Sequence, residues 1–209
     1  MNNNYKRLDI DSGIKLLTKD AKMEVLISKY GRPDLLPKND YFQSLMRSIV
    51  FQQLSGKAAN TIYQRLVSLL PDKKINPKEV LNLTDENMRQ AGLSFQKIKY
   101  VKNLAEFFNN HSFHKRDVNK MTDEEISNQL IEIKGIGQWT VDMFLMFTLN
   151  RPDIMPYADL GIQKGMKILL KMDNMPSKDE MKNHSEIWRP YRTIACWYLW
   201  KIVDDNFSW

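Results

Sequence analysis

The chain has 209 residues, 43% of them hydrophobic and 27% charged, which is typical of a globular protein. No apolar run approaches the roughly 18 residues that a membrane span requires. Lysine and arginine number 31 against 25 acidic residues, a net charge of +6 that suits a polyanionic partner without requiring one. The single cysteine, Cys196, excludes an internal disulfide and a four-thiolate zinc or iron–sulfur site.

The N-terminal residues 1–7 lack the apolar stretch of a signal peptide. We therefore expect a protein that is cytoplasmic (nucleoid-associated) or nuclear, and that has no membrane partner. We also expect a monomer.

Apolar residues follow helical spacing along nearly the whole chain. The pattern over 41–53 predicts one amphipathic helix, and Ser55 caps a second that stops at Pro71. No segment alternates apolar and polar residues with β-branched enrichment, so the predicted fold class is all-α. Four more helix starts are predicted from N-cap or capping-box patterns: Thr84, Ser94, Thr122 and Ser177.

A glycine pair stands out between two of these helices, in the sequence Lys134-Gly135-Ile136-Gly137. A helix over about 123–131 precedes it, and another begins at about Gln138. Two glycines around one apolar residue form a tight turn whose amides can bind an anion with the next helix N-terminus. An ordinary turn with a glycine C-cap is the commoner reason for a bare Gly-x-Gly.

The wider sequence Ile-Lys-Gly-Ile-Gly-Gln-Trp-Thr-Val at 133–141 resembles the helix-hairpin-helix (HhH-GPD) of base-excision DNA glycosylases, in their alkylpurine or 3-methyladenine branch. Other landmarks follow in matching order. Residues 49–55 resemble the segment that probes the DNA minor groove, and 91–94 with Lys97 resemble the next landmark. Residues 189–193, Arg-Pro-Tyr-Arg-Thr, resemble the closing helix.

This resemblance covers most of the chain and implies one catalytic unit, residues 1–209, with two helical lobes. The central lobe spans about 40–145 and includes the hairpin at 131–141. The second lobe combines about 1–39 with 146–209. The resemblance further implies that the active-site cleft lies between the lobes.

Asp159 is the predicted catalytic residue, because the family carries an aspartate about twenty residues after the hairpin. A plain N-cap of the helix that begins at Leu160 is the alternative, and the two roles are compatible. An anion there would stabilise the oxocarbenium-like sugar that forms when a purine leaves. We interpret Asp142, on an apolar helix, as a structural or interface acid and Asp153 as a solvated loop residue.

The resemblance implies a flipped base held by aromatic and apolar side chains, since a cationic purine binds well to aromatic faces. In lyase-competent branches a lysine stands where this chain has Trp139, so we expect water as nucleophile and no AP lyase activity. A glycosylase for neutral lesions (hypoxanthine, uracil or etheno bases) and a non-catalytic helix-hairpin-helix protein are the alternatives. The predicted base-pocket residues are Trp139, Met143, Tyr157, Leu160 and Trp200.

Duplex DNA with damaged bases is the expected partner, and Gln52, Gln53 and Leu54 are the candidates to fill the gap left by the flipped base. No cofactor is expected except a monovalent cation, Na⁺ or K⁺. The resemblance places this ion on backbone carbonyls of the hairpin, those of Ile131, Ile133 and Ile136. The full set of predicted DNA contacts is Gln52, Gln53, Leu54, Ser55, Lys97, Lys134, Gly135, Ile136, Gly137, Gln138 and Thr140.

Overall fold

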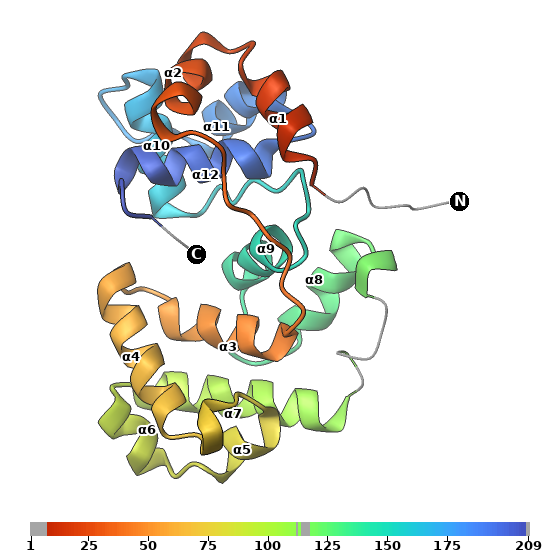
Figure 1. Ribbon diagram of the computed structural model, residues 1–209, viewed down its shortest axis with the longest axis vertical. Coiled ribbons are helices and arrows are strands. Elements are labelled where there is room, and N and C mark those ends of the chain that lie inside the picture. Colours follow the sequence, from red (N-terminus) through yellow and green to blue (C-terminus); the bar gives the residue numbers. More distant parts are fainter. Residues whose placement is uncertain (1–7, 112, 114–117, 208–209) are drawn as a thin grey trace. The chain divides into compact units, whose positions relative to one another are not determined.

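The computed structural model describes residues 8–111, 113 and 118–207 (Figure 1). Regular secondary structure in these residues is helical throughout, with no strand, which confirms the all-α prediction. The chain divides into two compact units, one of Met1–Pro37 with Leu145–Trp209 and one of Lys38–Phe144. None of the helices in the described ranges has the length and apolarity to cross a bilayer.

The unit of residues 38–144 is built around α7, which packs against α3 and α5 (Figure 1). Its core consists of fully buried aliphatic side chains such as Leu45, Ile49, Ile98 and Val101. These recur at helical spacing, so burial of one apolar face per helix holds the unit together. Its elements are α3 (Tyr41–Phe51), α4 (Gly56–Ser68), η1 (Pro71–Lys73), α5 (Pro77–Asn82), α6 (Asp85–Ala91), α7 (Phe95–Asn110), η3 (Val118–Lys120), α8 (Asp123–Ile131) and most of α9 (Gln138–Phe147).

The predicted helix starts are confirmed. Each predicted cap accepts a backbone N–H of the first turn through its side chain, at Ser55, Thr84, Ser94, Thr122 and Ser177. The last two also form the reciprocal glutamate contact of a capping box. Such a cap stabilises a helix by about 1 kcal/mol.

One predicted boundary is wrong. The helix expected over 41–53 ends at Phe51, and Gln52 leaves it in an extended conformation. Gln53 then adopts a positive φ of 57°, which is uncommon for a residue other than glycine. The two glutamines therefore belong to a turn rather than to a helix face.

The second unit is built around α12, which packs against α10, α2 and α1. Every residue of α12 from Arg192 to Trp200 is buried, as expected for a helix that is surrounded on all sides. At Gly165 of α10 an added Cβ would overlap the Leu199 carbonyl oxygen, so the close approach of these helices requires glycine. The elements are α1 (Ile10–Leu17), α2 (Ala21–Tyr30), α10 (Leu160–Leu170), α11 (Lys178–Ser185), η4 (Glu186–Trp188) and α12 (Arg192–Val203).

Candidate functional site

The turn between α8 and α9 is a hairpin with one closed and one open side. The Ile136 N–H donates to the Ile133 carbonyl at 2.9 Å, which tightens the turn. Gly135 has a φ of +109°, and a Cβ there would overlap the Tyr100 ring, so only glycine fits. At Gly137, by contrast, a Cβ would meet nothing within 4 Å. The backbone at Gly137 is therefore open to a ligand.

The segment after α3 is fixed to this hairpin by side chains. Gln52 Nε2 donates to the Gly135 carbonyl at 3.1 Å and to Thr140 Oγ1 at 3.0 Å. From α7, Lys97 Nζ donates to the carbonyls of Val50 (2.6 Å) and Gln52 (2.7 Å). Burial lowers the pKa of Lys97. Lys97 was predicted to contact DNA. In the structure its ammonium group binds carbonyls at the carboxyl end of α3, where the helix dipole favours a cation.

These contacts bring most of the predicted DNA-binding residues into one place in the unit of residues 38–144. They surround an open pocket of about 380 Å³. Leu54, just outside it, is 41% exposed, as a side chain that enters DNA must be. The residues that line the pocket are Gln52, Gln53, Ser94, Gln96, Lys97, Tyr100, Gly135, Ile136 and Gly137.

The rest of the predicted DNA-binding set does not line this pocket, and Thr140, one of this set, is buried and accepts from Gln52. Ser55 caps α4, and Lys134 is exposed while its carbonyl accepts from Asn103. The Gln138 side chain turns back on its own helix and donates to Asp142 Oδ1 at 2.8 Å. Asp142 is therefore tied locally to α9, in keeping with a structural interpretation.

Asp159, in the other unit, is the N-cap of α10, which was the alternative to a catalytic role in the sequence analysis. The two roles are compatible. Its Oδ1 accepts the Ile162 backbone N–H at 2.7 Å and the Trp200 indole N–H at 2.9 Å. Asp159 is only 9% exposed. Two donors on one oxygen fix the orientation of this side chain at the start of a helix, where negative charge is stabilised.

The indole that binds Asp159 is itself held from several sides. A Cβ at Gly161 would lie 2.7 Å from Cδ1 and 2.8 Å from Nε1 of Trp200, and 3.0 Å from Asp159 Oδ1. The ring of Phe207 stacks on the Trp200 ring at 5.1 Å and 17°, and Phe147 lies 5.5 Å from it. The absence of a side chain at Gly161 therefore permits the hydrogen bond, and the aromatic rings keep the indole in place.

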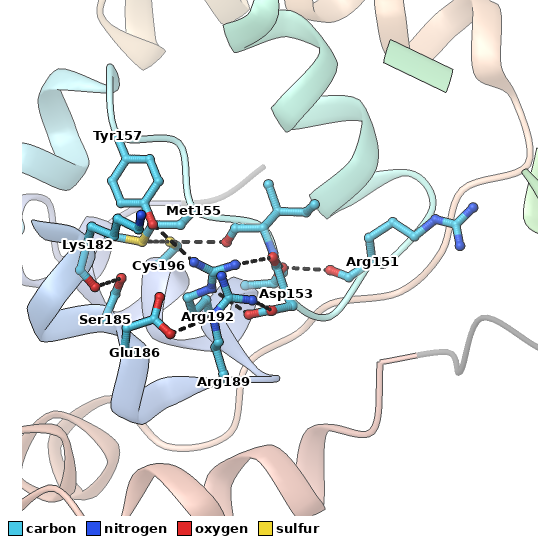
Figure 2. Close-up of polar contacts among 12 residues, drawn as sticks. Arg151, Asp153, Met155, Tyr157, Lys182, Ser185, Glu186, Arg189, Arg192 and Cys196 are labelled. Carbon is cyan, nitrogen blue, oxygen red and sulfur yellow. Dashed lines mark hydrogen bonds and ion pairs between the residues drawn. The ribbon is translucent and has the colours of Figure 1, made fainter. Parts of the chain in front are cut away.

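The loop that leads to Asp159 is anchored on α12 by charged side chains (Figure 2). Arg192 donates from Nε to Asp153 Oδ1 at 2.5 Å and from Nη1 to the Tyr157 hydroxyl at 3.0 Å. Arg189 Nη1 donates to the second oxygen of Asp153 at 2.6 Å. The interpretation of Asp153 as a solvated residue is wrong, because two arginines of the closing segment bind it.

Thr193 adds a second anchor beside this ion pair. Its hydroxyl donates to the Arg151 carbonyl at 2.6 Å and accepts the Ile154 N–H at 3.2 Å. Its backbone N–H donates to the Pro152 carbonyl at 3.0 Å. The helix α12 therefore holds the loop at both ends. Thr193 binds the start of the loop, and Trp200 binds the Asp159 carboxylate at its end.

The family model of the HhH-GPD superfamily of base excision DNA repair proteins matches residues 46–190. The chain belongs to this superfamily. The matched residues belong to both units. They include the hairpin and Asp159.

Individual HhH-GPD relatives match nearly the full length. DNA-3-methyladenine glycosylase 1 of Schizosaccharomyces pombe is 35% identical over 93% of this chain and 92% of its own. The solved structure of the Schizosaccharomyces pombe 3-methyladenine DNA glycosylase with abasic DNA has a TM-score of 0.86 at 35% identity, covering 94% of this chain and 100% of that one. A DNA-3-methyladenine glycosidase structure from Bacillus halodurans gives 0.74 at 36% identity, covering 92% and 89%.

The predicted base-pocket residues of this HhH-GPD chain fall in both units. Tyr157, Leu160 and Trp200 belong to the unit of Asp159, where Leu160 is 57% exposed on the first turn of α10. Trp139, half-buried, and Met143, fully buried, lie on α9 in the unit of residues 38–144. That the five line one pocket stays a prediction.

The predicted cation ligands are the carbonyls that flank the hairpin turn, those of Ile131, Ile133 and Ile136. The Ile133 carbonyl already accepts the Ile136 N–H, and its second lone pair remains suited to an ion. Backbone oxygens are hard donors that fit Na⁺ or K⁺ better than a transition metal. The cation itself stays a prediction.

Three residues of the aspartate site were not identified from the sequence. Arg192 lies in a segment singled out for its resemblance, but only the structure shows its partner Asp153. Gly161 carries a weak sequence signal, because it lies one turn before Gly165 on the same helix. Phe207 carries no sequence signal at all.

Proposed function

We propose that this HhH-GPD protein is a monofunctional DNA glycosylase that excises alkylated, cationic purines such as 3-methyladenine and 7-methylguanine from duplex DNA. The observation that carries the proposal is the Asp159 carboxylate, which two donors hold in one orientation at the start of α10. The named relative from Schizosaccharomyces pombe supports the substrate class.

Asp159 acts on the sugar in this mechanism. As the glycosidic bond breaks, its electron pair leaves with the base and positive charge develops on the deoxyribose. A fixed carboxylate stabilises that charge and orients the water that attacks C1′. An N3- or N7-alkylated purine is already cationic and leaves as a neutral base, so no strong general acid is required.

Water is the nucleophile, because Trp139 occupies the position at which the resemblance places a lysine in lyase-competent branches. An indole cannot form a Schiff base with the sugar. The product is therefore an abasic site with the strand intact. The protein works as a monomer on duplex DNA, in the nucleoid or the nucleus.

The open side of the hairpin binds a phosphate through its backbone amides and the start of α9. A monovalent cation on the carbonyls of Ile131, Ile133 and Ile136 would add positive charge beside that phosphate. Gln52 and Lys97 hold the neighbouring Gln53 and Leu54 so that they can enter the space left by the flipped nucleotide.

Base release from methylated duplex DNA tests the proposal, with wild type and Asp159→Asn compared at equal folded concentration. We expect wild type to free 3-methyladenine or 7-methylguanine, and the variant to bind DNA normally but release base about 10²–10³-fold more slowly, as when a transition-state charge partner is lost. Trp200→Phe keeps an aromatic ring but removes the N–H donor, and should slow release about tenfold or more.

Two outcomes contradict the proposal in different ways. If wild type binds duplex DNA but frees no alkylated base, the substrate class is wrong, and hypoxanthine-, uracil- and etheno-containing duplexes are assayed next. If Asp159→Asn releases base at the wild-type rate, the role of the carboxylate is wrong whatever the substrate.

A further inference from the structure

The helix that Asp159 caps, α10, has two contrasting faces. One face packs against α12 and is buried at Ile162, Gly165, Met166 and Leu169 (Figure 1). The opposite face carries residues at successive spacings of four and three, which place them in one line along the helix, followed four residues later by the C-cap, whose backbone is left-handed. These residues are Leu160, Lys164, Lys167 and Lys171.

The three lysines of this line, here called the lysine row, form a uniformly positive strip. From Leu160 to its C-cap Lys171, α10 contains these three lysines and no acidic residue. Lys164 and Lys171 are exposed and Lys167 is half-buried. Within the described residues, none of the three ammonium groups has a hydrogen bond or an ion pair.

Helix stability accounts for only part of this pattern. Lys167 and Lys171 lie at the carboxyl end of α10, where positive charge is favoured by the helix dipole. Lys164 lies in the first half of the helix, where that effect does not apply.

We propose that the lysine row binds the phosphates of duplex DNA that flank the damaged nucleotide. The row starts one turn from Asp159 and extends roughly 10 Å along the helix at 1.5 Å per residue. Lysine side chains are long and flexible, so the ammonium groups of such a row can reach successive phosphates of a DNA strand. The inference rests on the proposed function, in which the damaged nucleotide sits at Asp159.

The experiment measures binding to a duplex that contains a tetrahydrofuran abasic analogue, by fluorescence anisotropy from about 50 to 200 mM salt. The variant replaces Lys164, Lys167 and Lys171 together with glutamine. Each lost phosphate contact should reduce the slope of log affinity against log salt by about 1, so we expect a reduction of about 3. The loss of affinity should exceed about tenfold at the low end of this range.

A charge-matched control separates local contacts from the overall charge. Lys15, Lys22 and Lys178 are exposed lysines on other helices of the same unit, and their triple replacement by glutamine changes the net charge equally. We expect this control to alter the slope by less than about 1. If the two triple variants have the same slope, the lysine row is an ordinary solvated face and the proposal is overturned.

Activity distinguishes this inference from the proposed function. With the duplex saturated with protein, the lysine-row variant should lose less in its rate of base release than it loses in DNA affinity, whereas Asp159→Asn should lose rate and keep its affinity. If wild type releases no alkylated base but the row still sets the salt slope, the row is supported and the proposed function fails. Thermal unfolding checks the fold, and should the triple variant be unstable, Lys164→Gln alone should reduce the slope by about 1.

Discussion

The hairpin and the aspartate site are built in opposite ways. In the unit of residues 38–144, the hairpin offers backbone groups. On its closed side, Gln52 donates to the Gly135 carbonyl and the Tyr100 ring lies against Gly135. In the other unit, α10 offers a side chain, Asp159, and another side chain, Trp200, holds it. The first site depends on local backbone conformation, and the second depends on how two helices pack.

This difference predicts where each site is vulnerable. A backbone site is damaged by changes within its own turn and tolerates many changes around it. A carboxylate held by an indole from another helix is sensitive to residues that never touch DNA, since any change in the spacing of α10 and α12 moves the donor. Arg192 and Gly161 are such residues.

The largest effect is expected at Arg192, whose side chain is 8% exposed and binds Asp153. Arg192→Met keeps much of the volume but leaves a largely buried carboxylate short of a partner, which should destabilise the unit of Asp159 by about 3–5 kcal/mol. Urea unfolding followed by tryptophan fluorescence measures this, because α12 and η4 carry buried tryptophans.

Arg189→Met is the matched control for this prediction. Arg189 binds the same aspartate, but its side chain is 46% exposed, so water replaces most of its interaction and the loss should stay below about 1 kcal/mol. Equal losses for the two variants would show that the ion pair does not anchor the loop.

Much of the fold could be predicted from the sequence because its signals are local. Caps such as Ser94 and Thr122 satisfy amides two or three residues away, so their pattern is readable along the chain. The hairpin was predicted for the same reason, since Gly135 and its neighbours form one continuous motif. The end of α3 was missed because Gln52 and Gln53 are ordinary helix formers, which the hairpin and Lys97 hold in a turn.

The aspartate site was only half predictable. Asp159 itself was identified from the family resemblance, which places an aspartate about twenty residues after the hairpin, but its partners are far along the chain. Trp200 and Asp153 are each linked to their partners across roughly forty residues, and nothing in the local pattern shows which side chains meet. Tertiary packing decides that, and only the structure reveals it.

A pair of glycines on α10 tests whether helix packing sets the carboxylate. Gly161→Ala places a methyl group against Trp200 Nε1 and Asp159 Oδ1, which should break a hydrogen bond of about 1.5–3 kcal/mol and slow base release about 10- to 100-fold. DNA affinity should not change. Gly165→Ala meets the Leu199 backbone instead, so it should lower the unfolding free energy by about 1–3 kcal/mol.

Single-turnover base release and urea unfolding, measured for both glycine variants, separate the two roles. Gly161→Ala should show its larger effect on the rate and Gly165→Ala on stability. A Gly161→Ala protein that is folded and fully active would show that the indole N–H does not position Asp159, and that the carboxylate is held by its helix amide alone.

The smallest effects are expected in the hairpin, where two glycines again form a pair. Gly135→Ala forces a residue with a Cβ into a φ of +109° and against Tyr100, so it should cost about 1–3 kcal/mol of stability. Gly137→Ala meets nothing in the protein, so stability should stay within about 0.5 kcal/mol of wild type. Its methyl group would project from the open side, and binding to an abasic-analogue duplex should weaken about tenfold, as for loss of one charge-assisted phosphate contact. If Gly137→Ala binds DNA as wild type does, the open side of the hairpin is not the phosphate site, and the contrast between a backbone site and a side-chain site would no longer describe this protein.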